Sequence, residues 1–304
     1  MSKILFWSPL HGQGQTSNLH VTACIMSMLH KKRVLIMQTH FAGNNLESPL
    51  VGQNTDKYNV DNMGLFQDIG LDTAVTYSKM NQLNSNILES CCFSFPETKL
   101  LLLPGTKTKN RETFERDIEK SVSRVIRTAN KCIDMVLIDA DSTEEKLSFH
   151  LMEQADLIVI NLSQHRYVLE QFFMRYGDRF LNNNKVFYLF GDYDDNSSYN
   201  INNCRRKYNK FVTAANSGVI PYCTQFMDAQ NESRIISFMQ IGLHLRREND
   251  LKKVYYSMKT AFWYDKKSGA ENQYFFHRSK LAVDKMLQIL QISDTYKARL
   301  EKEG

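Results

Sequence analysis

Short apolar runs alternate with amphipathic segments along the first two thirds of the chain. The runs are four to six residues long and rich in aliphatic, β-branched and aromatic side chains, as is typical of strands covered on both faces. They fall at Ile4–Trp7, Val34–Met37, Lys99–Leu103, Met135–Ile138, Leu157–Ile160 and Lys185–Phe190. Each run predicts a buried strand.

Helical apolar spacing lies between several of these runs, at Thr16–His30, residues 111–132 and Val168–Leu181. The basic Lys31–Arg33 segment ends the first helix, which suits the negative end of a helix dipole. Strands that alternate with helices imply right-handed crossovers and a parallel sheet. The pattern therefore predicts an α/β fold with a central, mainly parallel sheet, although the polar stretch up to about residue 90 shows no clear pattern.

The C-terminal part of the chain differs in charge and in aromatic content. Residues 241–304 hold 13 Lys and Arg against 8 Asp and Glu, whereas residues 1–240 hold 25 of each, so the whole net charge of +5 lies in this part. Helical spacing recurs at Leu243–Tyr256 and Leu281–Ile292, and Asp265–Gly269 between them predicts a turn. We expect residues 1–240 to form one domain and residues 241–304 a basic, aromatic helical extension.

Two interpretations of this extension stay open. Its aromatic side chains could pack two helices on the main domain. Alternatively, the extension could be a docking surface for a partner protein, DNA or an anionic membrane, with Lys252, Lys253, Lys266 and Lys267 as its clustered charges.

Composition narrows the class of protein. The chain has 304 residues, of which 42% are hydrophobic, and this is ample for a buried core. No apolar run reaches the length of a membrane span, and the first residues lack the features of a signal peptide, so we expect a cytoplasmic protein. The six cysteines show no C-x-x-C spacing and the eight histidines no helix-spaced pair, so we expect reduced thiols and no structural metal.

A candidate phosphate-binding loop follows the first predicted strand. Gly12 and Gly14 precede Thr16, where helical spacing begins, and such a loop can direct backbone N–H groups and a helix N-terminus at an anion. The pattern G-x-x-x-x-G-K-[ST] is only partly met, because Pro9 replaces its first glycine and Gln15 its lysine. A strand-to-helix turn without a ligand is the alternative.

Other polar residues also follow predicted strands, namely Gln38–His40, Pro104 and Asp139–Asp141. In parallel sheets, ligands bind at the carboxyl ends of the strands. We therefore expect these loops and the Gly12–Thr16 loop to meet at one edge of the sheet and to form a nucleotide site.

The order of these segments resembles that of the ParA/MinD family of P-loop ATPases over most of residues 3–240. Leu10–Thr16 is similar to the family loop K-G-G-x-G-K-T. Five further segments are similar in order and spacing: VLIMQTHFAGNNL, LLLLPG, MVLIDADS, QADLIVINLSQ and IPYCTQFMDAQNE. The resemblance implies a three-layer P-loop fold with the C-terminal helices added to it.

The resemblance also implies a site for ATP and Mg²⁺. The cofactor-binding residues that it suggests are Gly12, Gln13, Gly14, Gln15, Thr16, Ser17, Pro221 and Tyr222. Thr16, through its hydroxyl, and Asp139 would hold the metal ion directly or through water. We assign no catalytic residue.

Several departures from the family pattern affect the chemistry. Gln15 stands in place of the lysine that contacts the outer phosphates, and Leu10 in place of the signature lysine that reaches across a dimer. Gln38 and His40 replace two aspartates that position water, and Gly191 or Asp192 falls at the position of an adenine-contacting asparagine. These changes predict a pseudo-ATPase whose turnover is slow or absent.

The resemblance suggests a function in spatial organisation or scaffolding, for example of pilus or secretion machinery. The loop Ser8–Gly14 is similar to the S-P-x-G-G-x-G loops of TadZ-like proteins, which help to localise type IVb pili. A homodimer, a protein partner from such a localisation system and a position at the inner face of the membrane would follow. The alternatives are a genuine ATPase that uses unconventional residues and a DNA-partition ATPase of plasmid-segregation type.

Overall fold

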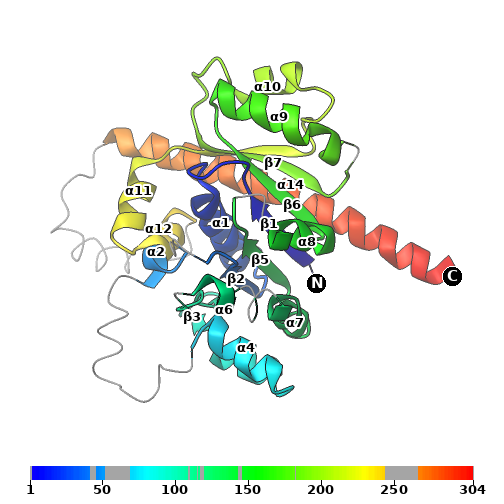
Figure 1. Cartoon of the computed structure of the whole chain (residues 1–304). Helices are drawn as coiled ribbons and strands as arrows, with labels where there is room; N and C mark the ends of the chain where they lie inside the picture. Colours follow the sequence, from blue (N-terminus) through cyan, green and yellow to red (C-terminus); the bar gives the residue numbers. More distant parts are fainter. Residues whose placement is uncertain are drawn as a thin grey trace.

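The computed structural model of the chain describes residues 2–41, 46–51, 69–108, 110–114, 116, 120–142, 146–181, 183–243 and 266–303. An eight-stranded sheet with the order β3-β4-β2-β5-β1-β6-β7-β8 forms its centre (Figure 1). The strands are β1 Ser2–Trp7, β2 Val34–Gln38, β3 Phe93–Ser94, β4 Leu100–Leu102, β5 Met135–Asp139, β6 Leu157–Leu162, β7 Val186–Tyr193 and β8 Ser217–Pro221.

The sheet is parallel except where β3 pairs with β4. This confirms the α/β prediction, and the six predicted strands are present with ends that differ by a few residues. The pattern did not predict β3 or β8. Within the predicted helix over residues 111–132, the described residues include α6 Arg111–Thr113, π-helical Phe114 and Arg116, and α7 Lys120–Ala129.

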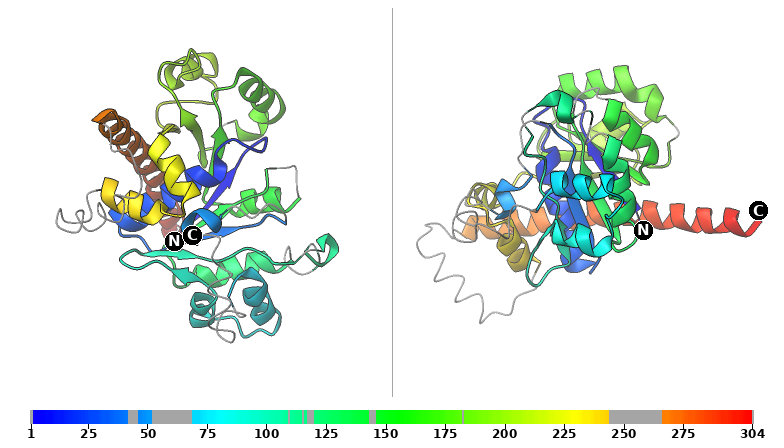
Figure 2. Two further views of the ribbon diagram at one scale, coloured as in Figure 1. Left: turned by 90° about the vertical axis from the view of Figure 1, so that its left-hand side faces the viewer. Right: turned by 60° about the horizontal axis from the view of Figure 1, so that its bottom comes forward.

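Helices cover both faces of the sheet and make three layers (Figures 1 and 2). One face carries α4 Leu71–Lys79, α5 Ser85–Ser90, α7, α8 Lys146–Gln154, α9 Arg166–Phe180 and α10 Ile201–Lys207. The other face carries α1 Gln15–Cys24, the π-helical turn η1 Ile25–Leu29, α2 Ser48–Val51, α11 Thr224–Asn231, α12 Ile235–Gly242 and α14 Lys266–Glu303.

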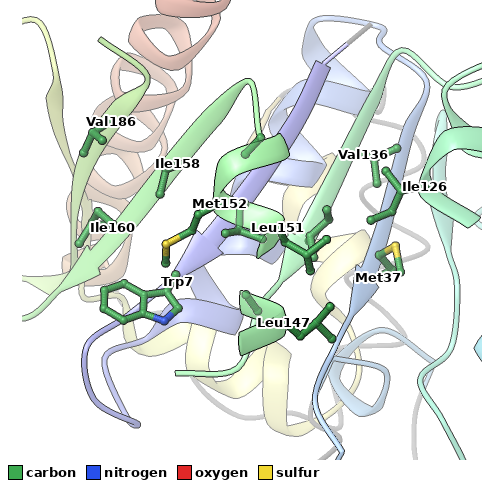
Figure 3. Close-up of a cluster of buried hydrophobic side chains, with 14 of the residues drawn as sticks. Trp7, Met37, Ile126, Val136, Leu147, Leu151, Met152, Ile158, Ile160 and Val186 are labelled. Carbon is green, nitrogen blue, oxygen red and sulfur yellow. The ribbon is translucent and has the colours of Figure 1, made fainter. Parts of the chain in front are cut away.

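Alternation along the strands divides the buried side chains between two cores. Leu5 and Trp7 of β1 face the core under α7, α8 and α9, while Ile4 and Phe6 face the core under α1 and α14. Figure 3 shows part of the first core, where Trp7 lies near Met152 and Ile160. Both faces of the strand are therefore apolar, which explains why the run carries no polar alternation.

The long helix α14 packs along the edge strand β8 and joins the second core. A Cβ at Gly218 would lie 2.7 Å from the Cβ of Ala282, so the glycine allows the helix to approach the strand closely. The predicted turn at Asp265–Gly269 is wrong, because α14 is helical from Lys266 onward. Gly269 has open space around it, and the packed turns that follow stabilise the helix through this weak position.

The predicted helical segment Leu281–Ile292 lies within α14, whose last turns extend away from the rest of the fold (Figures 1 and 2). The other predicted segment of the extension continues past Leu243 outside the described residues, and Lys252 and Lys253 lie there. Within the described segments, no helix has both the length and the apolar character of a membrane span. The six cysteines are free thiols, and Cys24, Cys91, Cys204 and Cys223 are buried.

Candidate functional site

Three neighbouring strands place their carboxyl ends side by side at one edge of the sheet. In β5, which lies between β1 and β2, Asp139 is in register with Phe6 on one side and with Gln38 on the other. The Ser8–Gly14 loop leaves β1 at this edge and leads into α1. The fold therefore places the glycine loop next to Asp139.

The two glycines of the loop have left-handed backbone conformations. Gly12 has a φ of 76° and Gly14 a φ of 68°, values that side chains with a Cβ rarely adopt. Gly14 is the N-cap of α1, and its carbonyl accepts a hydrogen bond from the N–H of Asn18 at 2.8 Å. The loop thus turns directly into a helix N-terminus, which favours anions.

Gln15 points into the protein and is 6% exposed. Its Nε2 donates one hydrogen bond to Asp139 Oδ1 and another to the carbonyl of Ala140, each at 2.6 Å. Its Oε1 accepts a hydrogen bond from Ser8 Oγ at 2.9 Å. Both amide hydrogens are therefore used within the protein, and the side chain offers none to a ligand in this arrangement.

Asp139 is buried beneath the loop at 1% exposure. Thr16 Oγ1 donates a hydrogen bond to its Oδ2 at 2.8 Å, while Gln15 donates to the other oxygen. Burial raises the pKa of Asp139, and the nearby His40 and the hydrogen bonds from Gln15 and Thr16 oppose this rise only in part. Removal from water thus destabilises the charged carboxylate, and a bound cation would offset this cost.

The other predicted cofactor-binding residues lie around the loop and α1 and bond to residues other than Asp139. Gln13 Nε2 donates to the carbonyl of His11 at 3.2 Å, within the loop itself. Ser17 Oγ accepts a hydrogen bond from Gln230 Nε2 at 2.8 Å, so α11 lies against the first turn of α1. Pro221 ends β8, and the 47% exposed Tyr222 follows it just before α11.

Residues that depart from the family pattern also lie around the loop. Leu10 is exposed, while the buried amide of Gln38 fills the space where a Cβ at Gly105 would lie. His40 is half-buried near Asp139. The carboxyl group of Asp192 lies next to Gly14, 3.5 Å from where a Cβ would be, and burial raises its pKa.

Two buried polar contacts of the site were not predicted from the sequence. Ser142 Oγ lies 3.0 Å from Ser8 Oγ and closes the network around Gln15. Asn18 Nδ2 donates to Asn161 Oδ1 at 2.9 Å, which links α1 to β6. An isolated serine or asparagine gives no sequence signal of this kind, because its partner lies more than a hundred residues away.

The residues present fit a magnesium ion better than they fit ATP. Thr16 and Asp139 bring a hydroxyl and a carboxylate oxygen together, and oxygen atoms of this kind are the ligands that Mg²⁺ prefers. For a triphosphate, the loop supplies backbone groups and a helix N-terminus but has no lysine, and the carboxyl group of Asp192 lies beside it.

Comparison with known proteins identifies relatives in structure alone. No protein-family model matches the sequence, and no curated protein matches it. A ParA family ATPase from Chlorobium tepidum matches with a TM-score of 0.62 and 15% identity over 77% of this chain and 91% of that chain.

Two further structures share this fold. A chain of the MinC:MinD cell division protein complex from Aquifex aeolicus has a TM-score of 0.53 and 16% identity over 78% of this chain and 88% of its own. MinD from Pyrococcus horikoshii complexed with Mg-ADP has a TM-score of 0.51 and 17% identity over 76% and 86%, respectively. The chain thus has the P-loop fold of the ParA and MinD ATPases.

Proposed function

We propose that this protein is a pseudo-ATPase of ParA/MinD type that organises or scaffolds other components in space, with ATP turnover slow or absent. The observation that carries this proposal is the position of Gln15, whose amide hydrogens are bound to Asp139 and Ala140. Phosphoryl transfer depends on groups that neutralise developing charge and orient the attacking water. Gln15 has no charge, and Gln38 and His40 replace the acidic pair.

Weak binding of Mg-nucleotide remains part of the proposal. Thr16 and Asp139 would hold Mg²⁺, and the N–H groups of the Gly12–Gly14 loop would face the phosphates. A bound Mg²⁺ supplies positive charge at the phosphates, and the matched MinD structure contains Mg-ADP. Gln13, Ser17, Pro221 and Tyr222 belong to the proposed nucleotide site through their places around α1 and β8.

The partners that we propose follow from the fold. The glycine loop lies at the carboxyl ends of the strands, where a second copy of the chain can associate with it. The matched MinC:MinD structure is a complex with a protein partner. We therefore propose a homodimer and a protein partner from a localisation or secretion system, such as TadZ-like pilus machinery. DNA or an anionic membrane at the inner face would be bound by the basic C-terminal region, including Lys266 and Lys267 of α14.

We expect the purified protein to hydrolyse ATP negligibly in the presence of Mg²⁺. The measurement is steady-state phosphate release, with the Asp139→Asn variant as the background, because that variant retains an acceptor for Gln15 but loses the charge. Turnover of about one per second or more, lost in the Asp139 variant, would establish a genuine ATPase and contradict the proposal. In that case, the partition-ATPase alternative would be preferred.

We also expect Gln15→Lys to tighten binding of Mg-ATP. A charge-assisted hydrogen bond contributes about 1.5–3 kcal/mol, which corresponds to roughly 10- to 100-fold in the dissociation constant. Titration calorimetry of the parent and the variant measures this difference. The lysine would restore a cation between Asp139 and the phosphates.

Gln13→Lys is the matched control, because it adds the same charge two residues away in the same loop. Only a cation at position 15 can reach Asp139, so the control should give a much smaller gain. Equal gains from both variants would indicate long-range attraction alone. No gain from Gln15→Lys would mean that the loop is not arranged as a phosphate cradle.

A further inference from the structure

A hollow of about 400 Å³ lies at the free edge of the sheet, away from the glycine loop. Its floor is β8, which pairs with a strand on one side alone among the described residues, and its walls are α10 and α14. These two helices cover opposite faces of the sheet. The hollow shares no residue with the site around Asp139.

Three cationic side chains line this hollow: Arg205 from α10, and Arg278 and Lys285 from α14. Arg205 Nε donates to Ser217 Oγ at 2.9 Å, and Lys285 Nζ donates to the carbonyl of Ala214 at 2.7 Å. These bonds hold the two cations at the hollow while other N–H groups of each side chain remain for a ligand.

One carboxylate, that of Asp195, lines the hollow in the described part of the chain. Arg278 lies 3.9 Å from it, and the Tyr274 hydroxyl also bonds it. The pKa of Asp195 is lowered by Tyr274, Tyr193 and Arg278, which together outweigh the effect of burial, so it carries its charge at neutral pH. Three cations thus face a single anion.

The cations also repel one another. Burial lowers the pKa of Lys285, and the charges of Arg205 and Arg278 lower it further. The pKa of Arg205 is likewise lowered by burial and by Arg278. A bound anion would relieve this repulsion, because it would place negative charge among the three groups.

Capping of the edge strand explains part of this arrangement. The carbonyl of Ser217 accepts from Arg205 at 3.3 Å and from Lys285 at 3.2 Å, and charged groups at an edge discourage pairing with another chain. Capping does not explain Arg278, which is held by Asp195 and by the rings of Tyr193 and Tyr274 and brings a third charge to the hollow.

Besides the charged groups and the polar Asn202 and Ser217, the lining includes several apolar residues. Ile201, Val219 and Ala282 are buried side chains that form part of the wall, and Leu281 beside them is 44% exposed. We propose that this hollow binds a small phosphate ester, with its phosphate on Arg205, Arg278 and Lys285 and its organic part against the apolar wall. Three cations and one carboxylate suit the roughly two negative charges of a phosphate monoester better than the single charge of a carboxylate, and guanidinium groups bind phosphate oxygens in pairs.

Titration with inorganic phosphate and with AMP at low ionic strength tests the proposal, using calorimetry and the NMR signals of the arginine Nε–H groups. We expect both probes to shift the signals of Arg205 and Arg278, and AMP to bind more tightly than phosphate. The double variant Arg205→Gln/Lys285→Gln should weaken binding roughly 10- to 100-fold, because it removes two charge-assisted contacts.

The matched control is Arg206→Gln/Lys280→Gln, which removes the same charge from the same two helices at exposed positions outside the hollow. It should bind like the parent. Arg278→Gln is a further test that leaves the bonds of Arg205 and Lys285 to Ser217 intact, so it remains informative if the double variant unfolds.

Equal affinity of parent, double variant and Arg278→Gln would overturn the proposal, as would failure of the parent to bind either probe. Equal binding of phosphate and AMP would overturn the role of the apolar wall. If duplex DNA alone bound, with loss in the double variant and not in its control, the hollow would instead hold a nucleic-acid backbone.

Discussion

Phe275→Ala is expected to lower the free energy of unfolding by about 3–5 kcal/mol, the usual cost of truncating a fully buried phenylalanine. Phe275 is 0% exposed, and its ring centroid lies 5.2 Å from that of Phe226 and 6.0 Å from that of Phe238. The ring therefore ties α14 to α11 and α12. Urea unfolding followed by circular dichroism measures the loss.

Leu281→Ala is the matched control on the same helix. Its side chain is 44% exposed, so truncation removes little buried area and should cost less than about 1 kcal/mol. A Phe275 variant with the unfolding midpoint of the parent would contradict the expectation and show that docking of α14 contributes little to stability. A separate early transition in the Phe275 variant would instead show that α14 detaches before the sheet unfolds.

The central sheet could be predicted because its strands are continuous apolar runs. Six of the eight strands carry such a run, since both faces of the sheet are covered by helices. The edge strand β8, Ser217–Pro221, contains a serine, a glycine and a terminal proline, so its own apolar pattern is weak. The position of β8 in the sheet depends on packing against α14, which can approach closely because Gly218 has no side chain.

The helical extension shows the limit of local signals. Lys266–Gly269 has the composition of a turn, yet the residues are helical because the same helix is held further along by Phe275, Val283 and Met286 in the core. Packing at a distance overrides local propensity here. Aromatic residues in the extension correctly suggested contact with the main domain, and Phe275 and Phe276 are both buried.

For the candidate site, the sequence predicted which residues lie close together better than it predicted which atoms bond to each other. Asp139 at a strand end and the Gly12–Thr16 loop were expected to meet, and Thr16 does bond Asp139. The inward turn of Gln15 could not be foreseen, because it depends on Ser8 and on the carbonyl of Ala140, which the fold brings together. A substitution alone shows which group is lost, whereas the structure shows what the new group binds.

A fully buried histidine on α1, the helix that follows the glycine loop, makes the stability of the protein depend on pH. His20 of α1 is 1% exposed, and its Nε2 lies 2.9 Å from the carbonyl of Leu46, to which it donates in the neutral form. Its Nδ1 is buried and has no hydrogen-bond partner among the described residues. Burial lowers the pKa of His20 from 6.5 to about 4, and the bond to Leu46 offsets this only in part.

We therefore expect the protein to lose stability as the pH falls from about 6.5 to about 4. In this range the unfolded chain binds a proton at His20 and the folded chain does not, so acid favours unfolding, and the contribution is fully present above pH 6.5. A shift of this size corresponds to about 3 kcal/mol, at about 1.4 kcal/mol for each pH unit. Urea unfolding at a series of pH values measures the slope.

The variant His20→Gln isolates this contribution, because its amide can donate to Leu46 but does not titrate. Between these pH values, its free energy of unfolding should change less than that of the parent. The difference should be close to the whole contribution of about 3 kcal/mol from His20. His277→Gln, at an exposed position on α14, is the matched control and should keep the slope of the parent. Parallel stability curves for the parent and His20→Gln would show that His20 becomes protonated without unfolding, for example because the segment that contains Leu46 moves and admits water.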